Sequence, residues 1–233
     1  MRLLCLSCLL LLWACTPTGN APPTKEVSSD TAAILPEEVA PEPAVISLPD
    51  YDTTLWQELH PEAHRLQVDL KYATTDNFVD EKMYPCGRCF LRPVVAEAVL
   101  AVQQQLAAQG LGLKLLDCYR PRPIQQKLWN KVPNPSYVTP PKKGSMHNRG
   151  RAVDLTLTDA SGKELDMGTP FDFFGPKAHH THTNLPDSIL QRRRLLKGIM
   201  ERNGFRSIRT EWWHYYYAKK GYKLEDWVWE CDE

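Results

Sequence analysis

Two segments repeat their apolar residues at helical spacing. In Pro93–Gln109 these residues fall three or four positions apart, with proline suited to the first turn and glycine next after the segment. Asp187–Asn203 has a second such stripe, and Gly204, a residue that commonly ends helices, follows it. We therefore expect two amphipathic helices here. Ile124–Asn130 favours a third, shorter helix.

Three other segments favour β-strands. Leu113–Cys118 has four apolar residues out of six and stops at a proline-rich stretch, whereas Glu211–Tyr217 is rich in aromatic residues. Ala152–Leu157 alternates, which places Asp154 on the face opposite its apolar residues. Helices and strands mixed without a regular strand–helix–strand repeat predict an α+β fold. We expect one domain, with a central, largely antiparallel sheet flanked by helices.

The N-terminus has the pattern of an export signal. Arg2 precedes an apolar run, Leu3–Ala14, which is too short to span a bilayer. The run ends at Leu12-Trp13-Ala14-Cys15, which resembles a bacterial lipobox, although Trp13 is unusual in it. We interpret residues 1–14 as a lipoprotein-type signal peptide and Cys15 as the lipidated residue. An ordinary secretory signal peptide is the alternative, and either interpretation exports the protein.

A proline-rich, acidic segment follows the signal. Thr16–Asp50 contains seven prolines, six acidic residues and one lysine, and it has no aromatic residue. Such a composition buries too little apolar surface to offset the entropy lost on ordering. We therefore expect residues 15–50 to be a tether and residues 51–233 to be the folded domain. The expected location is the periplasm, with membrane contact only through a lipid on Cys15.

The charge balance limits the classes of partner. The chain has 28 basic and 28 acidic side chains, so its formal net charge is zero. This balance lacks the positive footprint of a nucleic-acid binder. Arg192-Arg193-Arg194 is the one basic cluster, and its place in a helical pattern predicts a solvated or salt-bridged face.

Four cysteines lie in the expected domain, namely Cys86, Cys89, Cys118 and Cys231. In an oxidising compartment they suit two disulfides, with three pairings open. We favour Cys89 with Cys118 and Cys86 with Cys231, because a bond within Cys86–Cys89 would constrain almost no chain. A redox Cys-x-x-Cys site is an alternative that lacks a following strand–helix context. A four-thiolate zinc site is another, but only one pair is closely spaced.

Three separate segments carry the residues of a hydrolytic metal site. His147, Asp154 and His214 supply two imidazoles and one carboxylate, and a catalytic zinc uses three protein ligands while leaving a position for water. We predict one zinc ion per chain at the sheet. A nearby carboxylate must shuttle a proton during hydrolysis, and Glu211 is the candidate.

The spacing of Glu211 and His214 imposes a structural condition. Residues i and i+3 point to opposite faces of a regular strand. If both side chains reach the metal, the strand cannot be regular across them. We therefore expect Glu211 to lie in a bend entering the strand, or at a bulge.

Five motifs, in this order, resemble the D-alanyl-D-alanine dipeptidases of the vancomycin-resistance type, and they span most of the expected domain. They are Tyr72-Ala73-Thr74-Thr75-Asp76-Asn77-Phe78, Asp117-Cys118-Tyr119-Arg120-Pro121, Ser145-x-His147-x-x-Gly150-x-Ala152-x-Asp154-Leu155-Thr156-Leu157, Met167-Gly168-Thr169-Pro170-Phe171-Asp172 and Glu211-Trp212-Trp213-His214-Tyr215.

The resemblance implies roles for the matching residues and a small D,D-dipeptide as substrate. It gives His147, Asp154 and His214 as zinc ligands and Glu211 as the catalytic base. Arg120 matches the arginine that stabilises the oxyanion. Further matches are Asp172 as the partner of the substrate's ammonium group, and Tyr72 and Ser145 as residues that line the pocket.

Two other functions fit the same motifs. A zinc D,D-carboxypeptidase would share the ligands but need an open groove for peptidoglycan stems. The other is a cell-wall-binding lipoprotein that has lost catalysis. Such a protein would be expected to lack a metal ligand or the base, but the three ligands and Glu211 are all present. A dipeptidase needs a closed pocket, for which the loops Val132–Gly144 and Lys177–Leu185 are candidate walls.

Overall fold

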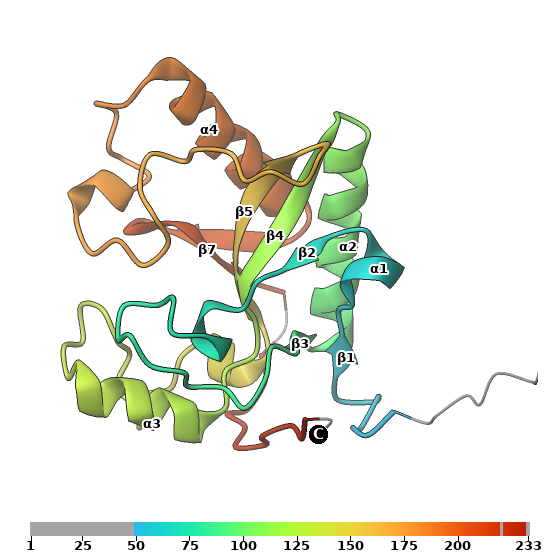
Figure 1. Ribbon diagram of the computed structural model, residues 1–233, viewed down its shortest axis with the longest axis vertical. Coiled ribbons are helices and arrows are strands. Elements are labelled where there is room, and N and C mark those ends of the chain that lie inside the picture. Colours follow the sequence, from blue (N-terminus) through green and yellow to red (C-terminus); the bar gives the residue numbers. More distant parts are fainter. Residues whose placement is uncertain (1–48, 220, 232–233) are drawn as a thin grey trace, which may run out of the picture. The chain divides into compact units, whose positions relative to one another are not determined.

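A five-stranded sheet forms the centre of the fold (Figure 1). The computed structural model describes residues 49–219 and 221–231. The strand order is β2-β4-β5-β7-β6, and only the β2–β4 pair is parallel. A separate antiparallel pair joins β1 (Gln57–Glu58) to β3 (Phe90–Leu91). The strands of the main sheet are β2 (Gln67–Val68), β4 (Leu111–Asp117), β5 (Ala152–Asp159), β6 (Phe205–Ile208) and β7 (Glu211–Tyr217).

Helices flank this sheet, which confirms the expected α+β fold with a largely antiparallel sheet. The three predicted helices are present as α2 (Pro93–Ala107), α3 (Arg122–Lys131) and α4 (Asp187–Arg202). A short helix, α1 (Pro61–His64), precedes them. In the described part of the chain, no helix is long and apolar enough to cross a membrane. The predicted signal peptide, Cys15 and most of the tether lie outside the described residues.

The two faces of β5 have different roles. Val153, Leu155 and Leu157 are fully buried on the face that the helices cover, since α4 contacts β5 and also touches α2. Asp154 points to the other face, as its place in the alternating pattern predicts. In β7, His214 lies directly opposite Asp154 in the antiparallel register. Directly opposed residues share a face, so the sheet itself brings these two side chains together.

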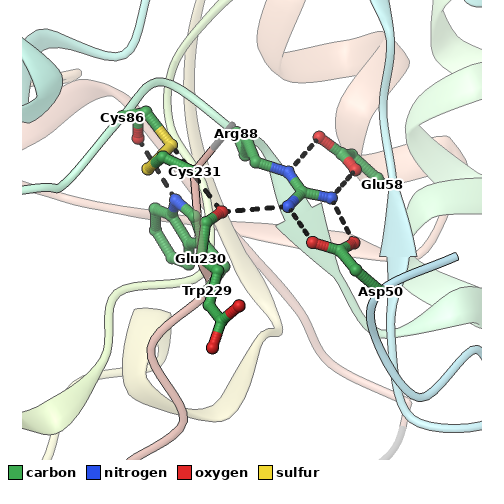
Figure 2. The surroundings of a disulfide bond; sticks show 7 residues. All are labelled: Asp50, Glu58, Cys86, Arg88, Trp229, Glu230 and Cys231. Carbon is green, nitrogen blue, oxygen red and sulfur yellow. Dashed lines mark hydrogen bonds and ion pairs between the residues drawn. A yellow bond between two sulfur atoms is a disulfide. The ribbon is translucent and has the colours of Figure 1, made fainter. Parts of the chain in front are cut away.

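Both favoured disulfides are present. Cys89 bonds to Cys118, and Cys86 bonds to Cys231 across 145 residues of sequence. Figure 2 shows the second bond beside Arg88, whose guanidinium contacts Asp50 and Glu58. Because all four thiols are paired, the alternatives of a redox Cys-x-x-Cys site and a thiolate zinc site are wrong.

The arginine cluster of α4 differs from the prediction. Arg194 is exposed, but Arg193 is buried, with 4% of its surface accessible. Its guanidinium donates hydrogen bonds to the backbone carbonyls of Met167, Lys177 and His179. Periodicity did not reveal this role, because the carbonyl acceptors come from a loop distant in sequence. Arg193 thus fixes both ends of the loop that carries Asp172.

Replacing Arg193 by alanine should lower the free energy of unfolding by about 2–4 kcal/mol, because three backbone carbonyls would lose the charged donor of a buried side chain. The matched variant Arg194→Ala should change it by less than about 0.5 kcal/mol, since that side chain is exposed. Urea unfolding followed by fluorescence measures both. Equal effects of the two substitutions would contradict the buried role of Arg193.

Candidate metal and substrate site

Three donor atoms from His147, Asp154 and His214 converge on one point. Asp154 Oδ1 lies 2.9 Å from His214 Nδ1, and its Oδ2 lies 3.3 Å from His147 Nε2. The two imidazole nitrogens are 3.1 Å apart. Tetrahedral ligands about 2.0–2.1 Å from zinc are separated by about 3.3 Å. The spacing and the buried donor set therefore fit a zinc ion. Among the described residues this is the one group of its kind.

The orientation of His147 is set by its second ring nitrogen. Nδ1 lies 2.7 Å from the carbonyl oxygen of Cys118. Because a carbonyl can only accept, Nδ1 carries the proton and Nε2 keeps its lone pair for a metal. Cys118 also carries the disulfide to Cys89, so this acceptor lies on a cross-linked strand end.

Glu211 reaches the same site because β7 begins irregularly. Ser207 of β6 pairs with Tyr215, but the next residue, Ile208, pairs with Glu211. This register shift is an irregularity of the kind expected from the spacing of Glu211 and His214, for which a bend or a bulge was predicted. It brings Glu211 Oε2 to 3.9 Å from His214 Nδ1. Burial raises the pKa of Glu211, the nearby His214 charge opposes that rise, and Asp154 adds to it.

Arg120 follows β4 and is held from two sides. Its Nη2 and Nε donate to Asp117 Oδ2 at 2.6 and 3.2 Å, and Nη1 donates to Gln125 Oε1 at 3.0 Å. Tyr84 also donates to Asp117, at 2.5 Å. Asp117 belongs to one of the five motifs, but its role was not predicted from the sequence. The sequence also did not identify Tyr84 and Gln125 as supports of Arg120, because single polar residues carry no periodic signal. A guanidinium has five N–H donors, so two remain available to a ligand.

Asp172 occupies the far side of the site and accepts a hydrogen bond from Tyr72 at 2.8 Å. Its backbone has φ +55°, in the left-handed region that Asp and Asn tolerate better than most residues. Trp212 donates to Thr169 Oγ1 at 2.8 Å, which attaches the Asp172 loop to β7. Burial raises the pKa of Asp172 well above its usual range, and the charge of Asp154 adds to this rise.

One cavity of about 300 Å³ contains all eight residues singled out from the sequence. Ser145 lines it beside His147, and its Oγ accepts a hydrogen bond from the His147 backbone N–H at 3.2 Å. The loop Val132–Gly144 forms part of the wall, as predicted. Lys177–Leu185 contributes no residue to the lining, so its prediction as a wall is wrong. Arg193 draws the carbonyls of that loop toward α4 instead.

A family model described as D-Ala-D-Ala dipeptidase matches residues 55–228. The chain belongs to this peptidase family. The D-alanyl-D-alanine dipeptidase of Escherichia coli is 38% identical over 167 residues, covering 70% of this chain and 85% of that protein. That of Enterococcus faecalis is 35% identical over 176 residues, covering 65% and 86%. A solved vancomycin-resistance D,D-dipeptidase, VanXYg, bound to a D-Ala-D-Ala phosphinate analogue, is 16% identical with a TM-score of 0.38, covering 70% and 66%.

The members of the dipeptidase family are zinc peptidases, and this chain is a peptidase of that kind. Its cavity has an aromatic wall that the sequence did not reveal. Phe174 stacks on Tyr137 with 4.3 Å between ring centroids and meets Phe78 edge-on at 5.0 Å. Phe78 in turn contacts Tyr72, which binds Asp172. These rings come from three separate loops, so neither periodicity nor the family motifs linked them.

Replacing Asp172 by asparagine should make the metal-free protein more stable at neutral pH. Because the folded pKa is raised, the folded state binds more protons than the unfolded state between the two pKa values, and stability falls as pH rises through that window. Asparagine keeps the left-handed backbone and removes this loss. Thermal unfolding of the metal-free proteins at pH 4 and pH 7 measures this gain in stability. The melting temperature of the variant should exceed that of wild type by more at pH 7 than at pH 4.

The same variant should lose kcat/KM on a free dipeptide by roughly ten- to a hundredfold, since an ammonium group would lose its charged partner. An Asp172→Asn protein that is less stable at pH 7 and equally active would contradict the assignment.

Proposed function

We propose that the chain hydrolyses D-alanyl-D-alanine, and similar short dipeptides of D-amino acids, to free amino acids with one bound zinc ion. The observation that carries this proposal is the cavity itself, where a three-residue metal donor set, Glu211, Arg120 and the half-buried carboxylate of Asp172 face one space. The curated relatives named dipeptidases support it, since the chain spans 85% and 86% of their lengths.

His147 Nε2, His214 Nδ1 and the Asp154 carboxylate would hold the zinc ion. When bound, zinc makes a water molecule acidic enough to react near neutral pH and polarises the carbonyl oxygen of the substrate. The protein supplies two neutral imidazoles and one carboxylate, so the site keeps a net positive charge. This charge favours the electron-rich carbonyl end of a peptide bond.

Glu211 is the proton carrier in this proposal. Its carboxylate takes a proton from the attacking water and delivers it to the nitrogen of the leaving amine. The raised pKa of Glu211 suits both halves of that transfer, because a group nearer neutrality accepts and returns a proton with less cost.

Arg120 stabilises the charge that develops on the carbonyl oxygen. Asp117 and Gln125 fix the guanidinium before substrate arrives, so little reorganisation is needed as the charge forms. The buried side chain also lies over the ring of Tyr72, 4.8 Å from its centroid. A fixed donor of this kind contributes about 3–4 kcal/mol to lowering a barrier.

The amino end of the cavity favours dipeptides over longer peptides. Asp172 is half-buried, and an ammonium ion beside it would supply an opposite charge. A longer peptide has a neutral amide at that position and gains no such interaction. The rings of Phe78, Phe174 and Tyr137 line the same cavity. These features favour a dipeptidase over a D,D-carboxypeptidase.

In the zinc-loaded full-length protein, D-Ala-D-Ala should release D-alanine with steady-state kinetics. Glu211→Ala should lower kcat by roughly a hundredfold or more, because a general base contributes about 10²–10⁴. His214→Ala should abolish stoichiometric zinc binding as well as activity. Glu62→Ala is the matched control, since that carboxylate is exposed on α1 and should leave kcat unchanged.

The competing functions predict different outcomes in the same assay. Cleavage of a stem pentapeptide with little release from free dipeptide would move the protein to the carboxypeptidase function. Tight zinc binding with no cleavage of either substrate would indicate a binding lipoprotein without catalysis. Full activity of Glu211→Ala would remove its role as proton carrier.

We also propose that the protein is exported and anchored in the periplasm through lipidated Cys15. The lipobox-like sequence suggests it, and two disulfides suit an oxidising compartment. An exported dipeptidase meets wall fragments rather than the cytosolic precursor pool. Salvage or wall turnover is therefore the role that this location favours over antibiotic resistance.

Growth with a labelled fatty acid should label the wild-type protein, and Cys15→Ala should abolish the label and release the protein from the membrane fraction. An exported wild-type protein that is never labelled would indicate an ordinary secretory signal instead. A protein that stays in the cytosol would contradict export altogether.

A further inference from the structure

The C-terminal segment 221–231, called the strap below, has no regular secondary structure and yet contacts both catalytic loops. None of its residues lines the substrate cavity. Most of its side chains are partly or fully exposed, while Trp229 is buried. Chain ends of this kind fray unless they are attached. Its attachments therefore identify what the strap does.

The strap holds the chain on both sides of Arg120, at Tyr119 and at Arg122. The Tyr119 hydroxyl donates to the Trp227 carbonyl at 2.8 Å, and their rings stack with 6.1 Å between centroids. On the other side, the backbone N–H of Arg122 donates to the carbonyl of Glu225 at 3.2 Å. The Arg122 guanidinium also forms an ion pair with Asp226.

The strap also holds the loop that carries Ser145 and His147. The Glu225 N–H donates to the Asn148 carbonyl at 2.9 Å, and Arg149 donates to the Tyr222 carbonyl at 2.7 Å. Leu224 packs so closely on Gly144 that a Cβ there would lie 2.1 Å from its Cδ2. Asn148 itself donates to the Arg120 carbonyl at 2.7 Å, which joins the two loops.

The end of the strap is fastened at Cys86 (Figure 2). There the Cys86–Cys231 disulfide lies beside two hydrogen bonds, from Trp229 Nε1 to the Cys86 carbonyl at 3.3 Å and from Arg88 to the Glu230 carbonyl at 3.1 Å. Trp229 also packs edge-on against Tyr84 at 5.2 Å. Tyr84 binds Asp117, so the fastened end contacts the support of Arg120.

We propose that the strap, fastened by the Cys86–Cys231 disulfide, positions Arg120 and His147 for catalysis, with Trp227 as its main positioning residue. This inference rests on the proposed function. Outside the strap, Trp227 contacts the rings of Trp56, Phe90 and Tyr119, and its carbonyl accepts the Tyr119 hydroxyl. Opening the disulfide would free the end of the strap, and the two loops would lose a shared support without losing any group that touches substrate.

The test compares Trp227→Ala and the double variant Cys86→Ser/Cys231→Ser with wild type, as zinc-loaded full-length proteins. We expect kcat on D-Ala-D-Ala to fall about tenfold or more, because displacements near 1 Å can cost about a hundredfold. KM should change much less, since Asp172 lines the cavity and no strap residue does. Zinc affinity, measured by competition with a chelator, should fall about tenfold, because the backbone next to His147 loses its contacts with the strap.

Val102→Ala is the control, because Val102 is buried in α2 and belongs neither to the strap nor to the cavity. It should lower the melting temperature and leave kcat and zinc affinity unchanged. Trp227→Phe should recover part of the kcat that Trp227→Ala loses, and it serves if the double serine variant does not fold.

Strap variants that melt earlier but retain wild-type kcat and zinc affinity, as Val102→Ala should, would overturn the proposal and leave the strap a purely stabilising element. If wild type itself releases no D-alanine, the proposed function fails. The zinc affinities then still decide whether the strap positions His147.

Discussion

The antiparallel pairing of β5 with β7 is the constraint on which the site depends. It places Asp154 opposite His214, which is 60 residues away in sequence. Both residues lie within paired strands, so strand pairing alone sets their relative position. A shift of one residue would turn one of these side chains to the helix-covered face. The apolar residues on that face, including Val153 and Leu155, make such a shift costly. Packing of the core therefore maintains the geometry of two metal donors.

The remaining functional groups, apart from Glu211 at the start of β7, come from loops and short helical turns, and polar contacts hold them. Asp117 is central, because its carboxylate meets Arg120, Tyr84 and, at 3.3 Å, Nδ1 of His147. A buried carboxylate without such partners would be strongly destabilising. Asp117 and these donors therefore stabilise one another. Supported side chains of this kind are what keeps a catalytic arrangement within the small tolerances that chemistry needs.

The sequence predicted elements whose signal is local. Amphipathic periodicity predicted α2 and α4, and the ordered motifs predicted the grouping of His147, Asp154 and His214. The spacing of Glu211 and His214 even required the irregularity found at the start of β7. Two-residue strands such as β2 were not predicted, because two residues have no measurable period. Arg193 was misplaced, and the ring contact between Phe174 and Tyr137 was missed, since partners from distant loops decide both.

The left-handed backbone at Asp172 restricts how this recognition site can change. At φ +55° a β-branched or bulky side chain is strongly disfavoured, whereas Asn and Gly are accommodated. Few single substitutions can therefore exchange this carboxylate for a different recognising group, and those most easily accepted only neutralise it. Divergence toward substrates with a blocked amino terminus would therefore begin with loss of the Asp172 carboxylate and of its proposed contact with an ammonium group. Gaining a new one would require remodelling the turn at Phe171–Phe173, a change of several residues.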